Sequence, residues 1–133
     1  MTSNQDLAWT VAIVDDDPGL RDSICSLLAT RGMASRQYES AETFLADPAA
    51  FDSLGCLLVD QHFPGMSGID LLRRLSADGR LPPAILFSAS LNERMVIEAR
   101  MAGALAVLDK PVGPAALLSQ LSTALSFATP VAC

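Results

Sequence analysis

The chain has 133 residues, a formal net charge of -6 at pH 7, 50% hydrophobic residues and few aromatic ones, which suits one globular domain with an aliphatic core. The acidic balance argues against nonspecific binding to nucleic acid or anionic membranes, because both need a surplus of Lys and Arg. No apolar run approaches the ~20 residues of a membrane span, no leader-like segment opens the chain, and its widely spaced cysteines suit a reducing compartment, so we expect a cytoplasmic protein.

Short apolar runs alternate with amphipathic segments, which predicts strands that alternate with helices. After the first run, Asp17 is a helix cap and Pro18 suits the first helical position, and Gly32 ends the helix that starts there. The predicted strands are residues 8–14, 34–38, 56–59, 83–87 and 105–108. The predicted helices are one that starts at Pro18, one that Ser40 opens, one that carries Ile69, Leu72 and Leu75, and two that span residues 92–102 and 114–126.

Five strand and helix units predict an α/β fold in which helices cover both faces of a parallel sheet, because near-continuous apolar strands must be buried on both sides. The twist of the strands makes the crossovers right-handed. No internal repeat and no linker divides the chain. We therefore expect one domain over residues 1–128 and a short tail over residues 129–133.

Polar side chains stand where four of the predicted strands end. They are Asp15 and Asp16 after the first strand, Asp60 after the third, Ser88 after the fourth and Lys110 after the fifth. In an open parallel sheet these ends share one edge, where ligands bind at a switch in strand order, so we expect the side chains to converge. Carboxylates, a hydroxyl and an ammonium together suit a site that binds a divalent cation and transfers a phosphoryl group to an aspartate.

Each of these side chains also has a purely structural interpretation. Asp17 caps a helix whatever the function, and Ser88 could bond only to the backbone at a strand end. Lys110 taken alone could extend into solvent, and Asp60 taken alone could belong to a turn. A charge that ends a buried run is costly unless it is paired, however, and the two acids before the cap exceed what a cap needs. The set as a whole therefore favours a cation site.

Four short motifs occur in order at these strand ends. They are Val14-Asp15-Asp16 with Arg21, Asp60 followed by Pro64 and Gly68, Ser88-Ala89, and Lys110-Pro111. Together they resemble the receiver domain of two-component response regulators over nearly the whole chain. Residues 38–45 and Met66-Ser67-Gly68 are most similar to receivers of nitrogen-fixation-type helix-turn-helix transcriptional regulators. The resemblance implies the flavodoxin-like (βα)5 fold, a doubly wound parallel sheet with strand order 2-1-3-4-5, and a cis bond before Pro111.

The resemblance also implies a signalling module and not a metabolic enzyme. Asp60 would accept a phosphoryl group from a sensor histidine kinase or a histidine phosphotransfer protein, and Lys110 and Ser88 would bind the phosphoryl oxygens. The implied Mg²⁺ ligands are the carboxylates of Asp15, Asp16 and Asp60 and the main-chain carbonyl of His62. Because the three carboxylates repel one another, we expect metal binding to stabilise the fold.

Two further positions bear on signalling. In this family the side chain two residues past the phosphoacceptor helps to set the lifetime of the phosphoryl group, and here it is His62. With Ser90, two residues past Ser88, it forms our hypothesis for a tuned dephosphorylation rate. Receivers usually carry an aromatic residue three positions before the lysine, where this chain has Val107. A valine offers fewer contacts that differ between two states, so we expect a smaller change at the fifth strand.

An apolar surface is expected near the end of the chain. Its residues are Met101, Leu105, Ala106 and Val107, on the face formed by residues 92–102, 105–108 and 114–126. Such residues are either ordinarily buried or form a surface for a partner or for a homodimer. The sequence does not decide between these interpretations.

Other functions remain to be weighed. An aspartate-nucleophile hydrolase uses similar groups, but it needs a second aspartate at position 62 and a cap domain. A phosphorylation-independent pseudo-receiver, acting as a docking module, would suit Val107 but not the complete set of polar residues. A truncated receiver of a DNA-binding transcriptional regulator would have the same sequence. As given, the chain has no DNA-binding segment after the last predicted helix, so we expect it to act through protein contacts.

Overall fold

The computed structural model describes residues 9–127. Its elements, in chain order, are β1 (Thr10–Val14), α2 (Pro18–Ala29), β2 (Ala34–Tyr38), α3 (Ala41–Ala46), β3 (Leu54–Asp60), α4 (Gly68–Ala77), β4 (Ala84–Ser88), α5 (Glu93–Met101), β5 (Ala106–Asp109) and α6 (Pro114–Phe127). Ala8 of the predicted first strand and the predicted tail over residues 129–133 lie outside the described residues. Within residues 9–127, no helix combines the length and apolar character that crossing a membrane requires.

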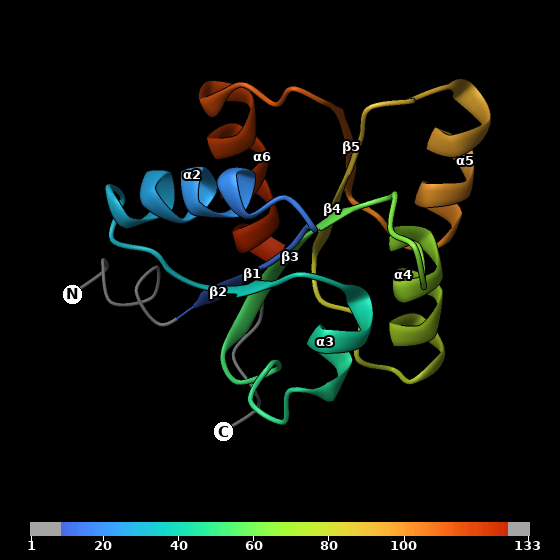
Figure 1. The fold of residues 1–133 in the computed structure, drawn as a ribbon, viewed down its shortest axis with the longest axis horizontal. Coiled ribbons are helices and arrows are strands. Elements are labelled where there is room, and N and C mark those ends of the chain that lie inside the picture. The colour runs from blue at the N-terminus through green and yellow to red at the C-terminus, as the bar shows by residue number, and fades with distance from the viewer. Residues whose placement is uncertain (1–8, 128–133) are drawn as a thin grey trace.

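The strands of this part of the chain form one parallel sheet in the order β2-β1-β3-β4-β5. The flavodoxin-like fold predicted from the sequence is therefore confirmed. The chain passes outward from β1 to β2 and then crosses to β3 on the other side of β1 (Figure 1). The carboxyl ends of β1 and β3 consequently border the switch point in strand order, where ligand sites form in such folds.

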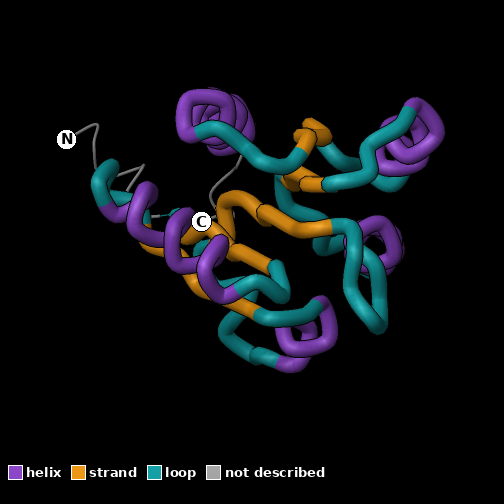
Figure 2. Tube along the Cα trace, turned by 45° about the horizontal axis from the view of Figure 1, so that its top comes forward, coloured by secondary structure: helices purple, strands orange, loops and turns teal. Residues whose placement is uncertain are grey.

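Helices cover both faces of the sheet, with α2 and α6 on one face and α3, α4 and α5 on the other. Figure 2 shows the strands as a layer between these two groups of helices. Alternate residues of β1 serve the two faces: Val11 and Ile13 pack toward α2 and α6, whereas Ala12 and Val14 pack on the opposite side. Because both faces are buried, the central strands are apolar along their length and polar residues stand only at their ends.

Side-chain caps fix the loops at the carboxyl edge of the sheet. Asp17 Oδ1 accepts a hydrogen bond from Gly19 N at 2.9 Å, so α2 begins directly after the acidic run that follows β1. Ser67 and Asp70 form a reciprocal capping box at the start of α4. Both loops that approach the switch point therefore end at a defined residue.

The observed bounds of β3 differ from the predicted ones. This strand covers Leu54–Asp60 instead of residues 56–59, and Gly55 is buried within it. Glycine is uncommon in strands, so the strand predicted from the sequence began after Gly55. In the fold, Gly55 lets Trp9 and Leu125 pack directly against the backbone, because a side chain there would overlap both.

The apolar residues near the end of the chain divide between the two interpretations that the sequence left open, exposure and burial. Met101 is 83% exposed and Leu105 is 38% exposed, but Ala106 is buried in the core beneath α2 and α6. The burial interpretation thus holds for Ala106, because strand residues alternate between faces and this one points into the core. Val107 accordingly packs half-buried in the opposite core. Ile97 of α5, which the sequence analysis did not include, is also exposed, and we call Ile97, Met101 and Leu105 together the α5 patch.

Candidate functional site

Two buried carboxylates lie side by side at the switch point. Val14 and Val59 are partners in the parallel pairing of β1 and β3, so the residues that follow them, Asp15 and Asp60, are brought together. Asp15 is 1% exposed and Asp60 is 5% exposed. Asp16 is exposed, and one carboxylate oxygen from each of the three acids lies within 4.8 Å of the others. The expected convergence of the acids is thus present in the fold.

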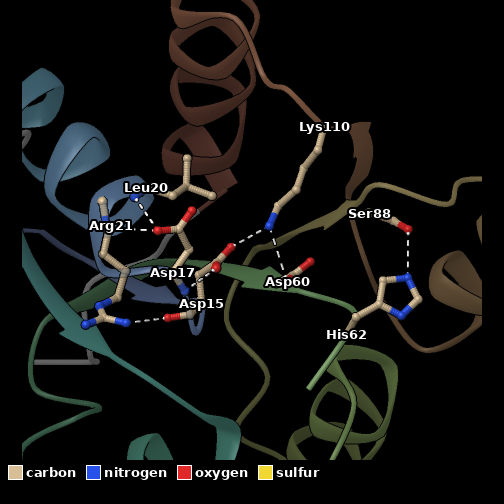
Figure 3. A network of polar contacts seen from close by, with 9 residues as sticks. Asp15, Asp17, Leu20, Arg21, Asp60, His62, Ser88 and Lys110 are labelled. Carbon is tan, nitrogen blue, oxygen red and sulfur yellow. Dashed lines mark hydrogen bonds and ion pairs between the residues drawn. The ribbon is translucent and has the colours of Figure 1, made fainter. Parts of the chain in front are cut away.

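Lys110 brings the only ammonium group into this cluster among the described residues. Its Nζ lies 2.8 Å from Asp15 Oδ2 and 3.3 Å from Asp60 Oδ2 (Figure 3). The position is fixed from the sheet, because Lys110 N donates to Ser88 O at 2.9 Å. The peptide bond before Pro111 is cis, as the resemblance implied. One ammonium pairs with two of the three clustered carboxylates, so the site keeps an excess of negative charge that suits a divalent cation.

Asp60 is held in an unfavourable environment. Its Oδ1 is buried and has no hydrogen-bond partner among the described residues. Burial and then the Asp15 carboxylate raise the pKa of Asp60, and the Lys110 ammonium and the nearby backbone N–H of His62 only partly oppose them. Burial lowers the pKa of Lys110, but its contacts with Asp15 and Asp60 outweigh this and raise it overall. A buried oxygen without a partner, next to several carboxylates, is typical of a site that binds a cation or another ligand.

Asp15 differs from Asp60 because both of its oxygens are used. Oδ1 accepts from Asp17 N at 2.9 Å, and Oδ2 accepts from Lys110 Nζ. The main-chain carbonyl of Asp15 accepts from Arg21 Nη1 at 2.6 Å, so Arg21 fastens the acidic loop to α2 (Figure 3). Sequence reasoning counted Arg21 within a motif but missed this role. The signal available was its position one turn after the capping Asp17.

Ser88 ends β4 as a fully buried hydroxyl. Its Oγ accepts a hydrogen bond from Ser90 N at 3.0 Å, and it lies 3.3 Å from His62 Nε2 (Figure 3). The exposed side chain of Ser90 takes no part in this contact, since only its main-chain N–H does. Val107 pairs with Leu86 in the sheet. The contact between His62 and Ser88 was not foreseen, because residues 26 positions apart gave no pattern that would join them.

The loop between β3 and α4 is fastened at both ends by residues that sequence reasoning missed. Gln61 Oε1 accepts from Ile69 N at 2.8 Å, and Glu42 Oε2 of α3 accepts from Met66 N at 2.8 Å. The hydrogen bond from Met66 is the main reason that the pKa of Glu42 is lowered. Gly65 permits this approach, because a side chain there would overlap the Glu42 carboxylate. The loop that carries His62 is therefore tied to α3 as well as to α4.

Known proteins match this chain over most of its length. Residues 11–122 match the family model described as the response regulator receiver domain. The transcriptional regulatory protein FixJ of Azorhizobium caulinodans is 34% identical over 115 residues, which are 86% of this chain and 54% of that protein. The C4-dicarboxylate transport transcriptional regulatory protein DctR of Rhodobacter capsulatus is 37% identical over 107 residues, 79% of this chain and 54% of that protein. The chain thus spans about half the length of these relatives.

Solved structures agree with these relatives. The crystal structure of FixJ-N has a TM-score of 0.82 and 32% sequence identity, and the match covers 92% of this chain and 98% of that one. The structure of the response regulator StyR has a TM-score of 0.82 and 34% identity, and the match covers 90% of this chain and 60% of that one. On the family match, the relatives and the fold together, the chain belongs to the response regulator receiver domain family.

Proposed function

We propose that this receiver domain accepts a phosphoryl group on Asp60. The observation that carries the proposal is the buried Asp60 Oδ1, which has no hydrogen-bond partner within residues 9–127, while Lys110 lies against the other oxygen of the same carboxylate. A nucleophile must keep an oxygen free, and Oδ1 is free. The family provides the class of reaction, phosphoryl transfer in a two-component system.

The transfer step uses this chain's own groups. A carboxylate oxygen of Asp60 attacks the phosphorus atom of the donor and forms a new O–P bond, while the bond to the donor nitrogen breaks and its electron pair leaves with the donor. The Lys110 ammonium and the Ser88 hydroxyl are the groups we assign to the phosphoryl oxygens. Positioning and electrostatic stabilisation supply most of the rate in such transfers. The domain thus acts on itself and is not a turnover enzyme for a separate substrate.

The acidic cluster fits Mg²⁺, which prefers oxygen ligands. We assign Asp15, Asp16, Asp60 and the main-chain carbonyl of His62 as its ligands, and the closeness of the three side chains supports this, since one oxygen from each lies within 4.8 Å of the others. When bound, the ion neutralises charge on the phosphoryl oxygens during transfer. The same ligands would lose much of their mutual repulsion, so binding should stabilise the domain.

The donor we propose is a sensor histidine kinase or a histidine phosphotransfer protein, acting in the cytoplasm. A protein donor needs a surface beside Asp60, and a mainly apolar cavity of about 420 Å³ opens next to Lys110 between α2 and α6. Its apolar lining includes Leu20, Ile24 and Val112. An apolar segment of a donor could rest there while its histidine approaches Asp60.

The output we propose is a change in protein contacts. The two relatives above are named as transcriptional regulators and are nearly twice as long as the matched region, which favours a receiver that serves a regulator of transcription. The α5 patch is our candidate for a homodimer surface through α5, β5 and α6, because its side chains are large, apolar and exposed. Met101→Lys should reduce dimer formation in sedimentation, and Ala29→Lys on the exposed surface of α2, outside the proposed interface, is the control. Ala106→Asp would not serve, since Ala106 is buried.

The lifetime of the phosphoryl group is the property we assign to His62 and Ser90. Both are exposed, and both contact the Ser88 hydroxyl, His62 through its ring and Ser90 through its main-chain N–H. Phosphoryl decay followed in His62→Ala and Ser90→Ala should differ from wild type. An unchanged half-life in both variants would refute this assignment.

The first test of the proposed function is intact mass after incubation with Mg²⁺ and acetyl phosphate. Wild type should gain one phosphoryl adduct, and chelator or Asp60→Asn should remove it. Absence of an adduct in wild type, with no response to beryllium fluoride and Mg²⁺, would instead favour the pseudo-receiver, which works only as a docking module.

A further inference from the structure

The Ser88 hydroxyl is shared between two neighbours in this structure. Its oxygen accepts the N–H of Ser90 at 3.0 Å, and His62 Nε2 lies 3.3 Å from the same oxygen. Ser88 is fully buried, whereas His62 sits in the exposed loop between β3 and α4. Figure 3 shows the imidazole reaching from that loop to the hydroxyl.

A hydroxyl has one proton to donate. Because Ser90 N–H already donates to Ser88 Oγ, the Ser88 proton is free to point toward the imidazole, where Nε2 accepts it when the ring proton is on Nδ1. A phosphoryl group on Asp60 would offer only acceptor oxygens. The imidazole and the phosphoryl group therefore require the same Ser88 proton.

We propose that His62 is a positioning residue that holds the Ser88 hydroxyl in the resting orientation and so opposes the phosphorylated state. This inference rests on the proposed function, because it needs a phosphoryl group on Asp60. It differs from a direct effect of His62 on the phosphoryl group, since here His62 acts only through Ser88.

The loop is built to hold the imidazole in place. Gln61 fastens its start through Ile69 N, and Glu42 fastens its end through Met66 N. Val107, the residue at the usual aromatic position, is half-buried in the core and has no polar atom to couple to Ser88. The contact between His62 and Ser88 therefore supplies a link between the phosphoacceptor loop and β4 that Val107 cannot supply.

The test is the affinity for beryllium fluoride in the presence of Mg²⁺, measured by amide NMR titration at constant pH. Four proteins form a double-mutant cycle: wild type, His62→Ala, Ser88→Ala and the double variant. His62→Ala should bind beryllium fluoride more tightly than wild type by roughly threefold to tenfold, the factor that one hydrogen bond provides. In the Ser88→Ala background the same change should have no effect. His62→Gln, which restores an acceptor, should return toward wild type.

A second readout concerns the resting protein without any ligand. Hydrogen exchange of the Ser90 amide should accelerate in His62→Ala, because the hydroxyl that accepts it becomes free to rotate. Unchanged or weaker beryllium fluoride binding in His62→Ala would overturn the inference, as would an equal effect with and without Ser88. If the wild-type protein binds no beryllium fluoride, the proposed function itself is overturned. If the wild type binds it normally and His62→Ala leaves the affinity unaltered, only the inference about His62 is overturned.

Discussion

Asp47 and Asp60 are both acids at the ends of secondary-structure elements, but their surroundings are opposite. Asp47 ends α3, and its two oxygens accept from Tyr38 Oη at 2.6 Å and from Ala49 N at 2.9 Å. These hydrogen bonds, with that from Tyr38 first, lower the pKa of Asp47. Asp60 ends β3 with one oxygen that has no hydrogen-bond partner in the described part of the chain, and burial raises its pKa.

The difference separates a carboxylate that fastens the fold from one that is kept available. Asp47 stabilises a corner beside Phe44, where its partner Tyr38 is buried and packs edge-on against the ring. Asp60 destabilises the metal-free domain, because its charge is buried and incompletely compensated. A fold tolerates this cost at a site where a ligand later offsets it.

The largest contrast should appear in phosphoryl transfer. With Mg²⁺ and acetyl phosphate, Asp60→Asn should abolish the adduct because the nucleophile is lost, whereas Asp47→Asn should keep it. Both substitutions replace one carboxylate with an amide of the same size, so they are matched. Intact mass measures the result, and an adduct retained in Asp60→Asn would place the phosphoryl group elsewhere.

Removal of the Lys110 ammonium should have the next largest effect, on the stability of the domain. Lys110→Met keeps the apolar stem but leaves two buried carboxylates without a cation, which should cost about 2–3 kcal/mol and lower Tm by about 10 °C in chelator. Mg²⁺ should recover part of the loss, since a cation again faces the acids. Arg94→Met is the control, because its side chain is 90% exposed. Equal melting of both variants would contradict the description of the site.

The stability of the two acid variants should change in opposite directions. In chelator near pH 7, Asp60→Asn should raise Tm by several degrees and Asp47→Asn should lower it. The pKa of Asp60 is raised in the folded protein, so ionisation of Asp60 destabilises the fold once the pH rises above 3.8, the ordinary pKa of an aspartate. The stability advantage of Asp60→Asn should therefore grow with pH. The lowered pKa of Asp47 means that its stabilisation disappears as the pH falls below 3.8, so the deficit of Asp47→Asn shrinks in acid. Thermal melts from pH 3 to 8 measure these differences. If the Tm of Asp60→Asn and the Tm of Asp47→Asn depend on pH in the same way, the comparison is wrong.

A smaller effect is expected at Glu42, a carboxylate that fastens the loop near Asp60. Glu42→Ala should speed hydrogen exchange of the Met66 amide and slow adduct formation by a few-fold, because the loop that carries His62 is released. Glu39→Ala removes an exposed charge that contacts no polar group among the described residues, and should leave both readouts unchanged. Met66 exchange that is the same in the two variants would exclude the anchoring role.

The smallest effect should come from Tyr38→Phe. This change removes the hydroxyl that donates a hydrogen bond to Asp47 and keeps the ring that packs against Phe44. The Tm should therefore fall by only a few degrees, and adduct formation should stay normal. Burial and the Asp47 carboxylate raise the pKa of Tyr38 to about 12, so the hydroxyl stays protonated throughout the range of the melts. A large loss of phosphorylation would mean that this corner is coupled to the site.

Much of the fold could be predicted because its signals are local. Residues 34–38 were predicted as a strand and form β2, and Asp17 with Pro18 marked the start of α2. Gly55 escaped prediction because its place in β3 depends on Trp9 and Leu125, which lie far away along the chain or on another element. Burial or exposure of Ala106 stayed open because the face that a strand residue occupies depends on register with its neighbours.

The sequence by itself determined the alternation of strands and helices, the sheet order that goes with the family pattern, and the edge to which Asp15, Asp60, Ser88 and Lys110 belong. The alternation and the shared edge follow from hydrophobic period and from residue types at strand ends, whereas the sheet order was implied by the resemblance to the receiver family. Tertiary structure alone decided which polar atoms meet: Lys110 with both buried acids, Arg21 with the Asp15 carbonyl, and His62 with Ser88. Such contacts join residues distant in the chain, and they depend on distances of a few ångströms that no local pattern encodes.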